Sequence, residues 1–388
     1  MDLQFDDQEV AFAESASRFL KEEWPFSKRE AIIESPDGFS REQWAAFADL
    51  GWLSLSLPEE HGGLGLGPAY LYLLMEQFGR ALVNSPYVST VVVGAAAIEQ
   101  ASDETLKAEL LPQIAAGKLL IAFANEEPSN RRSPLNIATA VRSEGDGFVL
   151  SGQKSAVQFA HVADRLIVSA RLSGKPEDRD GIGLFLVERD APGIALRTFV
   201  THDGGRASEL TLSDVRVGKA SALGAPGAAG PLLENLIDRG AAALAIDSMG
   251  AMWAVQEQTL AYLNAREQFG VKLASFQELQ HRLVDIFIKC ELARSLALDA
   301  SWALADAGQP QARKRISAAK YRIGTEACEV GKDGVHLHGG VGVTKEFAVG
   351  HYLKRAMVQN LIYGDAAWHF ARYQSIMMER NDTGPPTG

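Results

Sequence analysis

The stretch AREQFGVKLASFQELQHRL carries side chains that suit a nucleotide. Apolar spacing predicts that one helix ends at Gly270 and another begins after Ser275, so that Arg266, Phe269 and Gln277 meet at one corner. A guanidinium can bind a phosphate through two parallel hydrogen bonds, and a glutamine amide can pair with an adenine edge. An arginine here could instead only stabilise a helix C-terminus. The stretch therefore has two interpretations, a nucleotide site or a charged helix end.

Residues 335–347, VHLHGGVGVTKEF, hold a second group of this kind. The paired glycines Gly339 and Gly340 would let the backbone approach a bulky ligand closely. They lack the strand–helix–strand surroundings of a dinucleotide-binding glycine motif. His336 and His338 would point to different faces of a helix, and no third metal ligand follows at a recognisable spacing. The pattern favours a ligand contact over a metal site.

A single carboxylate, Asp365, interrupts the apolar run in LIYGDAAWHF. An aspartate directly before an amphipathic helix is a preferred N-cap. The same group, buried under a bound ligand, could act as a general base, because desolvation makes a carboxylate more basic. Both roles stay open at the level of the sequence.

Three segments with different sequence patterns must position these residues. Residues 1–119 have helical periodicity, with N-cap signals at Asp6 and Ser40. Residues 120–225 contain short β-prone runs, one pair around a Gly-Asp-Gly turn, with no helical period between them to suggest a parallel crossover sheet. Residues 226–388 contain four long helical runs with short connections. The sequence thus predicts a mostly helical protein with a central β domain, a barrel or sandwich, and a C-terminal four-helix bundle.

The composition excludes several classes of function. The chain has 388 residues, 46% of them hydrophobic, and a formal net charge of -11, which makes nucleic acid an improbable partner. No apolar run reaches the roughly 20 residues that cross a bilayer, so no membrane partner is expected. The acidic N-terminus lacks the order of a signal peptide. The two cysteines, Cys290 and Cys328, form no disulfide framework, which suits a cytoplasmic location.

The order and spacing of the motifs resemble the acyl-CoA dehydrogenase family along nearly the whole chain. The matching stretches are LPEEHGGLGL, LSGQK, ELTLSDVRV, REQFG followed by FQ, and HGGVGVT. THDGGRASEL and LIYGDAAWH resemble the branch of small subunits typified by the pimeloyl-CoA dehydrogenase small subunit, which is related to subunits that act on steroid side-chain CoA esters in bacteria. The resemblance implies an N-terminal helical domain, a β domain and a C-terminal four-helix bundle.

The resemblance also implies the chemistry. An enzyme of this kind uses FAD to convert an acyl-CoA thioester to the 2-enoyl-CoA, as in beta-oxidation of fatty acids or steroid side chains, and passes electrons to an electron-transferring flavoprotein. The subunits form a homotetramer, or a heterotetramer with a paralogous large subunit. Arg266, Phe269 and Gln277 match positions that hold the pyrophosphate and adenine end of a neighbouring subunit's FAD.

A further flavin-contacting stretch of the family matches His336, Gly339 and Gly340, and His336 stands where a glutamine is usual. The family's usual base is a glutamate directly after the Ile-Tyr step, where this chain has Gly364. Asp365 follows one position later.

A second location for the base in this family, on the long helix before Arg266, holds Gly240, and nearby Asp238 would lie on another helical face. Asp365 is therefore the best remaining candidate for the base. Its backbone N–H and a ribityl hydroxyl of FAD are the expected donors to the thioester oxygen.

Other departures gather on the side of the flavin ring. The family commonly has Thr-Glu-Pro followed by a small Gly-Ser-Asp loop, whereas here Glu126 replaces the threonine and Arg131 and Arg132 enter the loop. Ala156 and Gln158 stand where Trp-Ile-Thr is usual. The two arginines could meet a CoA phosphate or be solvated surface charges. We hypothesise that the chain lends its adenine-side corner to a partner's flavin while its own ring pocket is altered or empty.

Three functions remain open from the sequence. The first is a catalytic subunit of an FAD-dependent acyl-CoA dehydrogenase, active alone or only as a heteromer. The second is a non-catalytic subunit that completes the flavin site of a heteromeric acyl-CoA dehydrogenase. The third is an acyl-CoA oxidase or flavin monooxygenase on the same scaffold, which oxygen consumption without another acceptor would reveal.

Overall fold

The computed structural model describes residues 5–100, 103–128 and 133–381. Arg131 and Arg132 lie outside these residues. The chain divides into two compact units, which we call the helical unit and the sheet unit. The helical unit comprises Met1–Ala31, Pro68–Val83 and Ala241–Gly388, and the sheet unit comprises Ile32–Gly67 and Asn84–Gly240.

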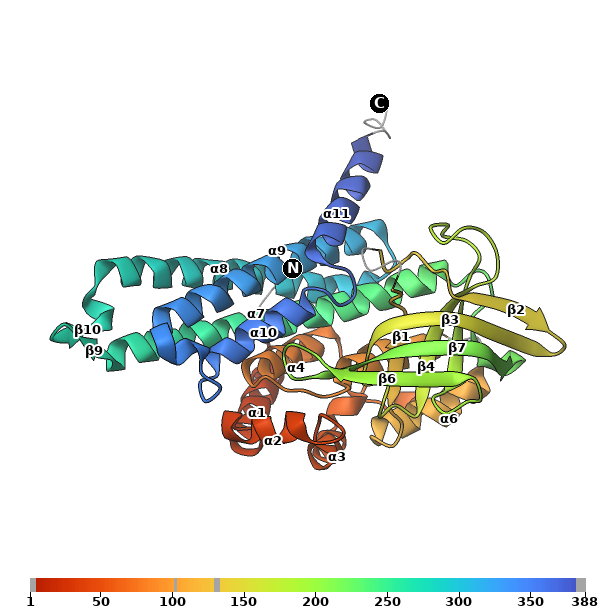
Figure 1. Ribbon diagram of the computed structural model, residues 1–388, viewed down its shortest axis with the longest axis horizontal. Coiled ribbons are helices and arrows are strands. Elements are labelled where there is room, and N and C mark those ends of the chain that lie inside the picture. The colour runs from red at the N-terminus through yellow and green to blue at the C-terminus, as the bar shows by residue number, and fades with distance from the viewer. Residues whose placement is uncertain (1–4, 101–102, 129–132, 382–388) are drawn as a thin grey trace. The chain divides into compact units, whose positions relative to one another are not determined.

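Long helices build most of the helical unit and confirm the predicted bundle. In Figure 1, α7, α8, α9 and α10 run alongside one another. The helices of this unit are α1 (Asp7–Glu23), α4 (Pro68–Arg80), α8 (Gln277–Ala303), α9 (Pro310–His338), α10 (Val349–Gln359) and α11 (Ala366–Asn381), with the start of α2 (Phe26–Glu34) and most of α7 (Gly230–Ala265). No described helix combines the length and the apolar character that a membrane crossing needs.

Two glycines explain how α4 and α7 pack so closely. A Cβ atom on Gly79 of α4 would lie 1.8 Å from the carbonyl oxygen of Asp247, and one on Gly250 of α7 would lie 2.1 Å from that of Glu76. Glycine weakens a helix locally. Here that weakness is offset because only a residue without a side chain allows the two backbones to approach this far.

Local capping signals are present where the sequence predicts them. The Asp6 carboxylate accepts a hydrogen bond from the Glu9 N–H at 2.8 Å, and the Glu9 side chain accepts one from Asp6, so α1 begins with a complete capping box. In the sheet unit, Ser40 accepts from the Gln43 N–H at the start of α3 (Arg41–Asp49). The other helices of that unit are a π-helix at Val88–Gly94, α5 (Ala95–Glu99) and α6 (Glu104–Ala115).

The sheet unit is built around one mixed sheet. Its strands follow the order β6-β7-β3-β2-β4-β5-β8, with β1 paired to β4. The strands are β1 (Ile121–Ala124), β2 (Ala140–Glu144), β3 (Gly147–Gln158), β4 (Arg165–Arg171), β5 (Ile182–Glu188), β6 (Ile194–Val200), β7 (Arg206–Gly218) and β8 (Ala222–Leu223). The predicted hairpin is present as β2–β3. Most pairs are antiparallel, as expected, but β1–β4 and one β2–β4 bridge are parallel.

Candidate functional site

The predicted nucleotide corner contains a hairpin that the sequence did not reveal. The helix α7 ends at Ala265 rather than at Gly270, and β9 (Glu267–Gln268) pairs with β10 (Val271–Lys272) before α8 begins at Gln277. The two residues of the turn, Phe269 and Gly270, have positive φ angles of 57° and 81°. Such a turn matches the twist of a two-residue hairpin. The helix prediction ran too long because the apolar spacing continues past Ala265.

The corner presents unpaired groups to solvent. The guanidinium of Arg266 is exposed and has no hydrogen-bond or ion-pair partner among the described residues, and the same is true of the Gln277 amide. The Phe269 ring is 91% exposed and meets the edge of Phe276 at 6.2 Å between ring centroids. A bulky side chain in the left-handed region is strained, and strained residues cluster at sites of contact. The corner is therefore suited to meet another molecule.

The glycine-rich stretch lies at the same end of the bundle. The Tyr262 ring, near the end of α7, stacks on His338, the last residue of α9, with centroids 4.5 Å apart. His336 is exposed, and its Nδ1 accepts a hydrogen bond of 3.2 Å from Arg282 on α8, whose guanidinium also pairs with Asp333 at 2.7 Å. The end of α9 thus lies beside the end of α7 and the start of α8.

The two histidines point to different sides, as their spacing predicts, because His338 is buried against Tyr262 while His336 is exposed. Gly339 has a φ of 61°, and a Cβ atom on Gly339 or Gly340 would meet no atom within 4 Å. The backbone of these two glycines is therefore open to contact with a ligand. Within the described parts of the chain, no group of three or more His, Cys, Asp or Glu side chains could hold a metal ion.

Asp365 occupies the N-cap of α11. Its Oδ1 accepts a hydrogen bond from the Trp368 N–H at 2.8 Å, so the capping role is present in the structure. No described group bonds to Oδ2 or accepts from the Asp365 N–H. The side chain is partly buried. One oxygen therefore caps the helix while the other is available to a proton, so the two predicted roles do not exclude each other.

Gly364 shows why the usual glutamate is absent. Its φ is 90°, and a Cβ atom there would lie 2.6 Å from Cε3 of Trp368 and 3.1 Å from Nε2 of His369. Tyr363 before it also has a positive φ of 59°. A side chain at position 364 would be strained and would clash, so in this backbone a carboxylate fits one residue later.

The corner and the turn of Asp365 lie far apart along α9. The turn that carries Asp365 packs on Ser317 and Lys320, whereas His338 lies at the corner. At 1.5 Å per residue, Lys320 and His338 are about 27 Å apart along the helix. The cofactor-binding candidates and the candidate base therefore do not converge on one reacting centre within this unit.

Three family models match consecutive parts of the chain. They describe the acyl-CoA dehydrogenase N-terminal domain over residues 6–118, the middle domain over residues 122–215 and the C-terminal domain over residues 231–374. The chain belongs to the acyl-CoA dehydrogenase family. This membership confirms the resemblance and the predicted class, an FAD-dependent oxidoreductase that acts on CH–CH groups.

Relatives of this acyl-CoA dehydrogenase match over most of their length. The probable acyl-CoA dehydrogenase YngJ of Bacillus subtilis (strain 168) is 29% identical, over 87% of this chain and 90% of the relative. Mitochondrial isovaleryl-CoA dehydrogenase of Pongo abelii is 28% identical, over 90% and 83%. A solved structure of a variant of the Tcur3481-Tcur3483 steroid ACAD has a TM-score of 0.87 at 29% identity and covers 97% of this chain and 99% of its own. These matches confirm the predicted helical–β–helical fold.

In this acyl-CoA dehydrogenase a buried ion pair supports the loop after β1. The Lys154 ammonium lies 2.7 Å from the Glu127 carboxylate, and neither side chain is more than 3% exposed. Glu127 also accepts hydrogen bonds from the backbone N–H groups of Ala138 and Thr139, at 2.8 and 3.0 Å. Burial opposes the charged form of Glu127, but the lysine and the backbone N–H of Thr139 outweigh it, so its pKa lies below the usual value.

The residues that depart from the family pattern lie next to the ion pair in the chain. The Ser155 N–H donates to the carbonyl oxygen of Glu126 at 2.8 Å, which joins the loop to β3. The ladder between β3 and β7 shifts register between Lys154 and Val157, and Ala156 in that irregularity has a φ of 52°. A bulge of this kind redirects the side chains around it. The sequence shows the substitutions at Glu126 and Ala156 but not the pair beneath them.

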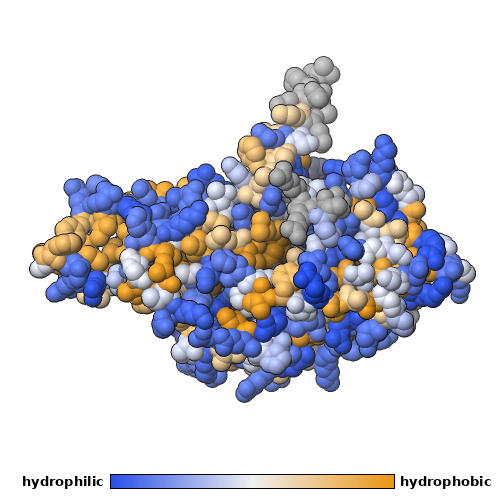
Figure 2. Space-filling view, viewed as in Figure 1, coloured by the Kyte–Doolittle hydropathy of each residue, from blue (hydrophilic) through white to orange (hydrophobic). Residues whose placement is uncertain are grey.

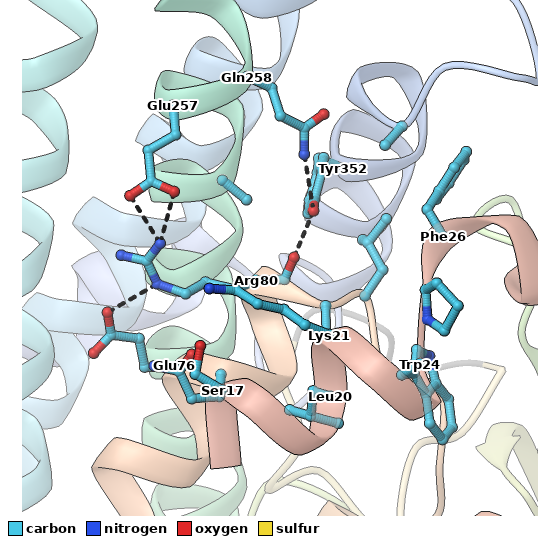
Figure 3. A pocket seen from close by; sticks show the side chains of 16 residues that line it. Ser17, Leu20, Lys21, Trp24, Phe26, Glu76, Arg80, Glu257, Gln258 and Tyr352 are labelled. Carbon is cyan, nitrogen blue, oxygen red and sulfur yellow. Dashed lines mark hydrogen bonds and ion pairs between the residues drawn. The ribbon is translucent and has the colours of Figure 1, made fainter. Parts of the chain in front are cut away.

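A cavity of about 450 Å³ in the helical unit holds none of the predicted site residues. Arg80 crosses it between two carboxylates, Glu76 at 3.1 Å and Glu257 at 3.0 Å, and Gln258 donates to the Tyr352 hydroxyl at 3.3 Å (Figure 3). The charge of Arg80 is therefore neutralised from within the protein. The cavity does not contribute to the candidate site.

Proposed function

We propose that this chain is a subunit of a heteromeric FAD-dependent acyl-CoA dehydrogenase that binds the nucleotide tail of a neighbouring chain's FAD at the corner around Arg266. The observation that carries the proposal is the position of this corner, with its exposed guanidinium and exposed Phe269, about 27 Å along α9 from the turn of Asp365. Arg266 and Asp365 are too far apart to contact the same reacting atoms. We therefore infer that the corner completes a site centred on another chain.

The chemistry of the corner supports this assignment. A guanidinium that no described side chain pairs with suits a pyrophosphate. The start of the long helix α8, where Gln277 is the first residue, favours an anion through its free N–H groups and dipole. An exposed aromatic ring offers a stacking surface for an adenine. His336, Gly339 and Gly340 are proposed as further contacts, because they lie at the same end of the bundle.

Exposed apolar side chains support assembly with another chain. In Figure 2, hydrophobic residues reach the surface at the end of the helical unit where β9 and β10 lie. Along the neighbouring α8, the exposed apolar residues are Val284 (55%), Phe287 (43%), Ile288 (49%) and Leu292 (49%). Stretches of exposed apolar surface mark sites of association. We expect a tetramer, with a paralogous large subunit as partner or, alternatively, of identical chains.

Two similar structures are named for pairs of different chains, which agrees with a heteromer. One names the pair Tcur3481-Tcur3483. Another is the ChsE4-ChsE5 complex from Mycobacterium tuberculosis, 24% identical with a TM-score of 0.87, which covers all of both chains. The substrate we propose is an acyl-CoA thioester, and the electron acceptor an electron-transferring flavoprotein. Because both cysteines are free, a reducing cytoplasm suits the chain.

In this proposal Asp365 removes the α-proton of the thioester. Its Oδ2 receives the proton while Oδ1 stays bonded to the Trp368 N–H, which keeps the carboxylate oriented. The Asp365 N–H, which no described group engages, donates to the thioester oxygen, where negative charge develops. Bound FAD would supply the acceptor for the hydride of the β-carbon. The protein supplies the orientation, the base and the hydrogen-bond donor.

A second candidate is a subunit without its own catalysis. Such a subunit would need Asp365 only as a helix cap, a contact that the structure contains. The changes at Glu126 and Ala156 fall in the region that the family uses for the flavin ring. This subunit would still lend its corner to a partner. The effect of replacing Asp365, described in the Discussion, separates the two candidates.

The flavin content of the purified protein tests the proposal. We expect the chain produced alone to bind less than one FAD per chain, and the assembly purified from the source cell to hold tightly bound FAD, because each site needs groups from two different chains. The measurement is the ratio of flavin absorbance to protein in both samples. One tightly bound FAD per chain in the protein produced alone would contradict the need for a different partner chain.

A further inference from the structure

A buried lysine lies beneath the turn that carries Asp365. Lys320 of α9 is 2% exposed, and its Nζ donates a hydrogen bond to the carbonyl oxygen of Gln359, the last residue of α10. An ammonium group removed from water is unfavourable unless it is partnered. The few groups that face this lysine therefore determine what it does.

The carbonyl that Lys320 holds belongs to a residue fixed from α7 as well. The Gln359 side chain accepts a hydrogen bond from Ser248 at 2.7 Å and donates one to Asp247 at 2.8 Å. Asp247 in turn pairs with Arg355 through two hydrogen bonds of 2.9 and 2.6 Å. All of these side chains are buried. The end of α10 is thus a rigid point from which the turn of residues 360–365 starts.

The same face of α9 holds the far end of this turn. On α11, Nδ1 of His369 lies 3.2 Å from the Ser317 hydroxyl, and Nε2 lies 2.9 Å from the Tyr363 carbonyl oxygen. Because a carbonyl only accepts, Nε2 carries the proton and the Ser317 hydroxyl donates to Nδ1. Gly324 packs so closely that a Cβ atom there would lie 2.4 Å from Oδ1 of Asn360. Contacts on both sides of the lysine therefore fix the turn against α9.

The charges that face the lysine are few. Burial lowers the pKa of Lys320 to about 7, while the negative charges of Cys328, when ionised, and Asp365 act in the opposite direction. Burial, together with the charges of Lys320 and Arg372, holds the pKa of His369 well below its usual value, so this histidine is neutral. Burial also raises the pKa of Cys328, so this thiol is neutral as well. Of Cys328 and Asp365, the aspartate is then the one whose negative charge favours the charged form of Lys320.

We propose that Lys320 is a positioning residue for Asp365: through its hydrogen bond to the Gln359 carbonyl it holds the turn of residues 360–365, and with it the Asp365 carboxylate, in place. The inference rests on the proposed function, in which Asp365 is the base. It adds a second group, a buried amine on a different helix, on which the placement of that base depends.

The Lys320→Met variant tests this proposal. The assembly, assayed with octanoyl-CoA, pimeloyl-CoA and a steroid side-chain CoA ester, is expected to show a kcat about tenfold lower with little change in KM, because the base is no longer held in place. Lys320→Gln, which keeps an N–H donor for the Gln359 carbonyl, should recover most of this loss. No loss of kcat in Lys320→Met, or an equal loss in Lys320→Gln, would overturn the proposal.

A double variant separates this inference from the proposed function. In the Asp365→Asn background, Lys320→Met should cause no further loss of kcat, because no base is then left for the lysine to position. An equal loss in both backgrounds would count against the coupling. Normal turnover of Asp365→Asn alone would instead reject Asp365 as the base. Slow turnover of Asp365→Asn with unchanged turnover of Lys320→Met would reject only the role of the lysine.

A measurement of stability gives a readout that needs no substrate. Because burial lowers the lysine pKa to about 7 in the folded protein from about 10.4 in the unfolded chain, the unfolded state binds more protons between these values. The wild type should therefore gain stability relative to Lys320→Met as pH rises through this window. Equal pH dependence of the two unfolding midpoints would show that the lysine does not titrate as described.

The variant is expected to fold. Replacing a buried charge by an apolar residue of similar length is often tolerated, and the Gln359 carbonyl keeps a hydrogen bond from the Ile362 N–H at 3.3 Å. If Lys320→Met were nevertheless insoluble, Lys320→Leu, which also removes the hydrogen-bond donor, carries the same test with the same expected loss of kcat. An unchanged kcat in that variant would reject the proposal.

Discussion

The Asp365→Asn variant is expected to fold normally and to turn over its acyl-CoA substrate more slowly by on the order of a hundredfold or more. Asparagine caps a helix about as well as aspartate, so the hydrogen bond from the Trp368 N–H is kept. Only the ability to accept the α-proton is lost. The measurement is kcat of the purified assembly together with its thermal unfolding midpoint.

A matched cap provides the control for this variant. Asp103 caps α6 in the same way, with its carboxylate accepting from the Thr105 N–H at 2.8 Å. Asp103→Asn should leave both turnover and stability unchanged, because that carboxylate has no part in the proposed reaction. If Asp365→Asn behaved like Asp103→Asn, Asp365 would be a cap alone and the subunit would be catalytically silent.

The second large effect concerns stability. Lys154→Met is expected to lower the free energy of unfolding of the sheet unit by about 3–5 kcal/mol, because it leaves the Glu127 carboxylate buried without its cation. The two backbone N–H groups that bond to Glu127 remain, but they do not neutralise its charge. The measurement is the shift in the urea midpoint, with hydrogen exchange of β1 and β3 to locate the change.

Two further variants define what that result means. The double variant Lys154→Met with Glu127→Gln removes both charges and should be less destabilised than Lys154→Met alone, which is the sign of an uncompensated buried charge. Lys345→Met breaks an exposed pair with Glu30 and should change stability by less than about 1 kcal/mol. A single variant as stable as the wild type would contradict the role of the pair.

The parts of the fold that the sequence predicts correctly depend on neighbours along the chain. The capping box at Asp6 and Glu9 spans one helical turn, and the β2–β3 hairpin depends on the glycines around Asp146. The long helices follow from apolar spacing over several turns. Each of these signals is local, so no knowledge of the fold is needed to read it.

What the sequence could not predict depends on contacts between distant segments. The hairpin β9–β10 is too short for a strand pattern, and the helical spacing of α7 continues into it. The partner of Lys154 lies 27 residues earlier in the chain, and the carbonyl that Lys320 holds lies 39 residues later. A lysine among apolar residues at an inward-facing position, as in β3 and α9, was the available signal for both.

The candidate site also has features that the sequence predicts and features that only the structure shows. The sequence identified Arg266, Phe269 and Gln277 as one group from their spacing, and Asp365 as a cap or a base. It did not show that the cap engages only Oδ1 of Asp365, or that a side chain at position 364 would clash with Trp368. Those findings depend on the path of the turn, which is fixed by α9.

The most direct test of the account is the visible spectrum of the assembly purified with Arg266→Glu in this chain. Charge reversal puts a carboxylate beside the proposed position of the pyrophosphate of the neighbouring chain's FAD, so we predict loss of most of the absorbance at about 450 nm while the chains still assemble. An assembly that carries Arg266→Glu and keeps its full yellow chromophore, or a wild-type assembly without that chromophore, would contradict the account.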